Sequence, residues 1–172
     1  MKKSIPILLG LLLLFCLSAS STAQSSQKNL SQLELAQQFI GTWESDIGED
    51  SLIHFICAPS GKGFFWRMDW KANGETFSTA SSVLGLDPDH KTLILSSIWQ
   101  QGNTAQDIGR FVSETKLVWE RFLPGQPNHA TALSEVDFSQ PNTFTWLMYG
   151  RDSDITWEPP WKFKWTFTRV DE

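Results

Sequence analysis

The sequence is poor in the residue types that cross-link a domain or bind a metal ion. It has only two cysteines and three histidines in 172 residues. Cys16 lies in an apolar N-terminal segment, so Cys57 is the only cysteine in the rest of the chain and has no partner for an intramolecular disulfide there. His54, His90 and His129 are far apart and show no metal-ligand spacing. We therefore predict no disulfide framework, no metal site and no other cofactor.

Basic residues and long apolar runs are also scarce. The chain carries 14 basic and 19 acidic residues, which gives a net charge of −5 at pH 7. An acidic protein is repelled by nucleic acid and by anionic membranes, so we expect neither as a partner. No apolar run reaches the about 20 residues that a membrane-spanning helix needs. The composition leaves the oligomeric state open.

The N-terminus has the three parts of an export signal. Lys2 and Lys3 precede an apolar run from Ile5 to Leu17, and Ser21-Thr22-Ala23 has the small residues after which signal peptidases cut. We interpret residues 1–23 as a signal peptide and expect the protein in the periplasm or the extracellular medium. Loss of two of the 14 basic residues would leave 12 against 19 acidic ones, a net charge of −7.

The remainder has the pattern of one domain preceded by a short leader. Residues 24–38 form a polar leader and a predicted short helix, because apolar residues recur at helical spacing up to Phe39. In residues 39–172, β-rich runs are separated by turn residues every eight to twelve positions or so, which predicts about eight to ten antiparallel strands. Asn73-Gly74 is the strongest hairpin signal among these turns.

The first and last strands are expected to meet. Gly41-Thr42-Trp43 opens the first strand. In the segment from Trp161 to Arg169, strict alternation places four aromatic side chains and Arg169 on one strand face. A sheet of such strands must bury one face, and a meander can do so by closing on itself. The predicted fold is therefore all-β: a single antiparallel up-and-down (meander) β-barrel with a short N-terminal helix.

Two sets of residues resemble known families. Gly41-Thr42-Trp43 and Arg169 resemble the lipocalin/calycin signature, in which the arginine packs across the first-strand tryptophan and closes the base of the barrel. The resemblance implies a structural, barrel-closing role for Gly41, Trp43 and Arg169. Four further motifs resemble a family of secreted bacterial lipocalin-like domains without an assigned function: Gly85-Leu86-Asp87-Pro88, Gly109-Arg110-Phe111, Leu117-Val118-Trp119-Glu120 and Thr143-Phe144-Thr145-Trp146.

That resemblance brings no catalytic residue with it. The sequence also lacks a second or third lipocalin signature and the stapling disulfide of many lipocalins. A ten-strand relative closer to fatty-acid-binding or nitrobindin-like barrels therefore stays open.

Aromatic and thioether side chains on the expected inward faces are the candidate ligand-binding residues. If the barrel has a mouth, they would line an apolar pocket for a small hydrophobic molecule. The alternative is that they simply fill the interior, as in many small barrels. The candidates are Trp66, Met68, Trp70, Trp99, Phe144, Trp146, Phe163 and Trp165.

Few other side chains suggest chemistry. Glu120 shares a strand face with Val118 and Phe122, so we expect it to be the inward acid that balances an inward arginine. His54 is the candidate for an inward histidine, although its offset from Cys57 places the two on opposite faces. No spacing brings two carboxylates together as general acid and base, and we predict no catalytic residue.

Three functions follow from these patterns. The first is an exported barrel that binds a small hydrophobic molecule without transforming it. The second is an enzyme on the same barrel, of the isomerase or decarboxylase type, which needs an inward acid or histidine near the mouth. The third is an envelope or glycan interaction module that uses the loop tryptophans Trp157 and Trp161.

Removal of the predicted signal peptide fixes the start of the exported protein. N-terminal sequencing of protein recovered from the periplasm or medium should begin at Gln24. Cys16 is a poor lipidation site, because the residue before a lipidated cysteine is normally small and here it is Phe15. Incorporation of labelled fatty acid, or retention of residues 1–23, would contradict this prediction.

Overall fold

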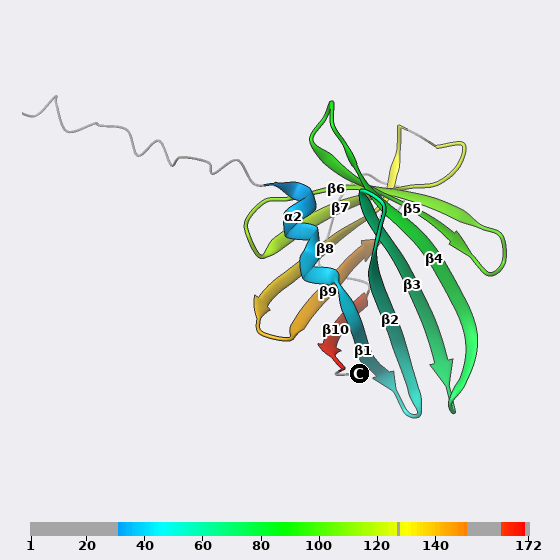
Figure 1. Cartoon of the computed structure of the whole chain (residues 1–172). Helices are drawn as coiled ribbons and strands as arrows, with labels where there is room; N and C mark the ends of the chain where they lie inside the picture. The colour runs from blue at the N-terminus through cyan, green and yellow to red at the C-terminus, as the bar shows by residue number, and fades with distance from the viewer. Residues whose placement is uncertain (1–30, 127, 151–162, 171–172) are drawn as a thin grey trace, which may run out of the picture.

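The computed structural model describes residues 31–126, 128–150 and 163–170, and it confirms the all-β prediction. A short helix, α2 (Gln32–Leu35), continues into a 3-10 turn, η1 (Ala36–Phe39), before the first strand. Ten antiparallel strands then close into a barrel in which each strand pairs with its neighbours in the chain and β1 pairs with β10 (Figure 1). The strands are β1 (Gly41–Gly48), β2 (Ser51–Ser60), β3 (Gly63–Ala72), β4 (Glu75–Asp87), β5 (Thr92–Trp99), β6 (Thr104–Phe111), β7 (Lys116–Phe122), β8 (Ala130–Gln140), β9 (Thr143–Gly150) and β10 (Phe163–Arg169).

Local turn chemistry agrees with this topology. Asn73 and Gly74, which connect β3 and β4, both have positive φ values, 51° and 78°. A two-residue type I′ hairpin turn requires that conformation at both positions. The first strand begins at Gly41 and the last ends at Arg169, as expected.

The helical segment covers one end of the barrel and leads directly into β1 (Figure 1). The Gln32 side chain forms two hydrogen bonds with the backbone of Phe111, because its amide donates to the carbonyl oxygen and its oxygen accepts from the N–H. Gln38 donates to the carbonyl oxygen of Glu114 in the β6–β7 turn. These bonds hold the segment on β6 and on the turn that follows it.

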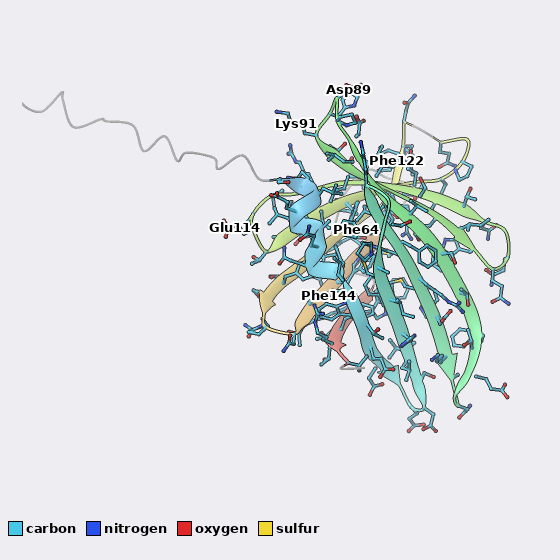
Figure 2. The ribbon with its side chains drawn as sticks, viewed as in Figure 1. Phe64, Asp89, Lys91, Glu114, Phe122 and Phe144 are labelled. Carbon is cyan, nitrogen blue, oxygen red and sulfur yellow. The ribbon has the colours of Figure 1, made fainter. Side chains whose placement is uncertain are left out.

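Phe39 fills the end of the barrel beneath this segment. Its side chain is fully buried, and its ring lies 4.5 Å from Trp66 and 5.5 Å from Phe144, measured between ring centroids. Phe144 in turn stacks on Phe167 at 4.6 Å. Phe64 and Phe144 lie in the body of the barrel, and Glu114, on the β6–β7 turn, lies beside the helical segment (Figure 2). We call the aromatic cluster of Phe39, Trp66, Phe144 and Phe167 the floor.

Trp43 and Arg169 meet where the barrel closes. They are cross-strand partners in β1 and β10, and the Arg169 guanidinium lies 4.2 Å from the centroid of the Trp43 ring. Arg169 Nη1 also donates to the carbonyl oxygen of Ile40, and the Trp43 indole N–H donates to that of Phe39. A single cation–π pair therefore joins the first strand, the last strand and the end of the helical segment.

Gly41 leaves the space that Arg169 occupies. Its φ is +127°, and a Cβ atom at this position would lie 2.6 Å from Arg169 Nη1. Gly48, at the other end of β1, has a similar φ of +142° but no heavy atom within 4 Å of the corresponding position. Both glycines thus have a positive φ, but an added Cβ would contact Arg169 only at Gly41.

We therefore predict that Gly41→Ala destabilises the protein by about 1–3 kcal/mol more than Gly48→Ala. Both alanines carry the cost of a positive φ, but only the first displaces Arg169 from Trp43. Urea unfolding of the two variants and the wild type measures the difference. Equal destabilisation by both would show that the Arg169 contact contributes nothing to closure.

Candidate functional site

Six of the eight predicted ligand-binding side chains line one cavity inside the barrel, towards the end opposite the helical segment. They are Trp66, Met68, Trp70, Trp99, Trp146 and Trp165, and they share the wall with Ala80, Ser82, Leu95, Ser97, Arg121 and Met148. The volume of the cavity is about 40 Å³. This is room for a few water molecules at most, so the aromatic side chains occupy most of the interior.

A row of small residues creates the space that remains. Trp66 lies opposite Ser82, Ser82 opposite Ser97, and Ser97 opposite Ala105 across four neighbouring strands. The Ser82 hydroxyl donates to Ser97 Oγ at 2.8 Å, so one hydrogen bond joins the two side chains within the wall. The small-residue character of β4 explains why the cavity lies on this side of Trp66.

The aromatic residues that line the cavity become less buried towards the end of the barrel opposite the helical segment. Trp66 and Trp146 are buried, whereas Trp70, Trp99 and Trp165 are only partly so. The rings of Trp70 and Trp99 stack with their centroids 5.1 Å apart, and the edge of Trp165 meets Trp146 at 6.4 Å. We call Trp70, Trp99 and Trp165 the mouth residues.

The other two predicted binding residues lie outside the cavity. Phe144 is buried in the floor, where it stacks on Phe167. Phe163 is 46% exposed at the start of β10 and stacks on Trp165 at 5.6 Å. Strand alternation gave both residues the correct parity, but parity does not indicate how far along the barrel axis a side chain lies.

The inward ion pair of the barrel is Asp107 with Arg121, and the prediction for Glu120 is wrong. Asp107 and Arg121 are cross-strand partners, and the guanidinium donates to both carboxylate oxygens, from Nε at 2.8 Å and from Nη2 at 3.1 Å. Glu120 lies on the exposed face of β7. Apolar residues occur on both faces of that strand, so alternation alone could not tell the inward face from the outward one.

Asp107 is 3% exposed, and its burial raises the pKa of the carboxyl group although the Arg121 guanidinium acts in the opposite direction. The ion pair is enclosed by protein, and Arg121 forms part of the cavity wall. The cavity thus combines an aromatic lining with one internally compensated charge.

The histidines do not form a site. His54 lies on the outer face of β2, opposite Glu44 and Asp69 on the neighbouring strands, so the prediction of an inward histidine at this position is wrong. His90 is exposed and contacts the Asp87 carboxylate at 2.7 Å within a turn, which lowers the pKa of that carboxyl group. Within the described ranges, no three histidine, cysteine, aspartate or glutamate side chains are grouped so that they could hold a metal ion.

A second hollow lies on the outer wall and was not predicted from the sequence. The base of this groove is a row of cross-strand neighbours on β3 to β7: Phe65, Val83, Ser96, Gln106 and Phe122. The groove has a volume of about 760 Å³, and its apolar lining is completed by Ile98, Leu123 and Pro124. The signal was present in the sequence as apolar residues on the solvent parity of successive strands.

Comparison with known proteins does not assign a family. No protein-family model matches the sequence, and a search of the curated proteins finds no significant match. The closed ten-strand meander is consistent with a lipocalin/calycin-like fold. No helix in the described part of the chain is both long and apolar enough to pass through a bilayer. Residues 1–30, Trp157 and Trp161 lie outside the described residues.

Cys57 is buried on the inward face of β2, and its environment predicts an inert thiol. Burial raises its pKa from 9.0 to about 12, an effect that the neighbouring Trp66 N–H partly offsets.

The Cys57 thiol of the native protein should therefore not react with a thiol reagent at pH 8 but should react fully in urea. Because the folded state holds the proton more tightly, stability should fall between pH 9 and 12 in the wild type more than in Cys57→Ala. Rapid labelling of the native protein would contradict this.

Proposed function

We propose that this protein is an exported lipocalin-like barrel that binds a small hydrophobic molecule at the mouth of the barrel. The observation that carries the proposal is the convergence of seven aromatic and thioether side chains on one interior cavity. Export is supported by the signal-like sequence of residues 1–23. The kinship with secreted bacterial lipocalin-like domains rests on the sequence motifs and belongs to the same proposal.

A ligand larger than a few waters must move side chains to enter, and the lining suits that movement. Met68 and Met148 are flexible and polarisable, so they can repack around different shapes. The mouth residues are only partly buried, which lowers the cost of displacing them. The floor is tightly packed by contrast, so opening is expected at the mouth alone.

The Asp107–Arg121 pair also keeps the enzyme hypothesis as a second candidate. An isomerase or decarboxylase on this barrel needs an ionisable group inside, and Arg121 lines the cavity. Under this hypothesis Arg121 would stabilise a developing negative charge on the substrate. The glycan hypothesis depends on Trp157 and Trp161 and draws no support from the described residues.

Two adjacent residues on β5 distinguish the interior from the outer groove. Trp99 faces the cavity, and Ile98 is 54% exposed in the groove. We expect the neutral polarity dye Nile red, and fatty acids that compete with it, to bind the wild type and Ile98→Ala equally. Trp99→Ala should weaken binding roughly tenfold or more, because it removes one ring of the stacked pair.

Dye fluorescence titration measures both affinities, and urea unfolding checks that each variant is folded. Loss of binding in Ile98→Ala with retention in Trp99→Ala would place the ligand in the outer groove. Failure of the dye and of every fatty acid in a broad panel to bind the wild type would overturn the proposal.

A further inference from the structure

Two of the tryptophans that line the cavity carry buried indole N–H groups. The indole N–H groups of Trp66 and Trp146 are buried and have no hydrogen-bond partner within the described ranges. The Trp66 N–H lies near the Cys57 sulfur, a weak acceptor, and lowers the pKa of that thiol. Trp43 shows the usual arrangement, because its N–H donates to the Phe39 carbonyl oxygen at 2.8 Å. Buried polar groups are normally satisfied, so Trp66 and Trp146 are exceptions with a shared location.

Arg121 adds further donors to the same wall. A guanidinium has five N–H groups, and Asp107 takes one on Nε and one on Nη2. The other three N–H groups make no hydrogen bond in the part of the chain that the structure describes. Ser82 donates to Ser97, whose own hydroxyl still has a proton to donate, and the indole and guanidinium groups can only donate, so donors predominate on the cavity wall.

The net charge of the site constrains what those donors would accept. Arg121 is already compensated by Asp107, so a bound anion would leave one buried negative charge in excess. A neutral acceptor such as a carbonyl oxygen satisfies the indole N–H groups without adding charge. The rings of Trp66, Trp146 and the mouth residues match a flat apolar skeleton around that acceptor.

We propose that the cavity binds neutral, planar apolar molecules that carry a carbonyl oxygen, and that the Trp146 N–H, with Arg121 on the same cavity wall, recognises this oxygen. This inference rests on the proposed function and adds the chemical class of the ligand.

Indane and indanone are suitable probes, because they have nearly the same size and differ by a carbonyl group. Calorimetric titration of the wild type should show indanone binding about tenfold more tightly than indane. In Trp146→Phe, which keeps a ring and loses the N–H, the ratio should fall towards one. Trp119→Phe is the matched control: its N–H is also buried and unpartnered within the described residues, but the ring does not line the cavity, so the ratio should persist.

Each result has one meaning. Equal binding of indane and indanone to the wild type would overturn recognition of the carbonyl group and leave hydrophobic binding intact. Absence of binding by both would overturn the ligand class together with the proposed function. Tighter binding of indane carboxylate than of indanone would show that the site takes an anion. The wild-type ratio decides between these outcomes even if Trp146→Phe does not fold.

Discussion

Closure of the barrel depends on the contact between Arg169 and Trp43. An antiparallel meander leaves two free edges unless its first and last strands pair, and exposed edges favour aggregation. β1 and β10 pair over a short stretch, Trp43 with Arg169 and Glu44 with Thr168, whereas β2 and β3 pair along their whole length. A short seam needs side chains to reinforce it. Arg169 does so by stacking on Trp43 and bonding to Ile40, in space that Gly41 leaves free.

This closure divides the interior into two regions with different properties. The helical segment next to the seam brings Phe39 onto Phe144 and Trp66, so one end is tightly packed. Towards the other end the small residues of β4 and β5 oppose the large rings, and a cavity remains beside Arg121. Well-packed aromatic clusters resist rearrangement, while partly exposed rings beside methionines repack at low cost. The described residues therefore leave internal space at one end of the barrel and fill the other end.

Alternation of side chains along the strands was enough to predict much of the interior. Together with the turn residues it indicated about eight to ten strands, the meeting of the first and last, and the inward direction of Trp66, Trp70 and Trp146. It failed for Glu120, because β7 carries apolar residues on both faces. It also missed Asp107, whose partner Arg121 lies fourteen residues away in the chain and becomes its neighbour only through strand pairing.

The sequence by itself determined the all-β meander, the short helix and the two strands that close the barrel, because period-two alternation and turn residues are local properties of the chain. Only the tertiary structure decided how far along the axis each side chain lies. It placed Phe144 in the floor and Trp99 at the mouth, and it left the Trp146 N–H without an acceptor in the described chain. Volume, register and hydrogen-bond satisfaction arise from pairs of residues that meet only when the barrel closes.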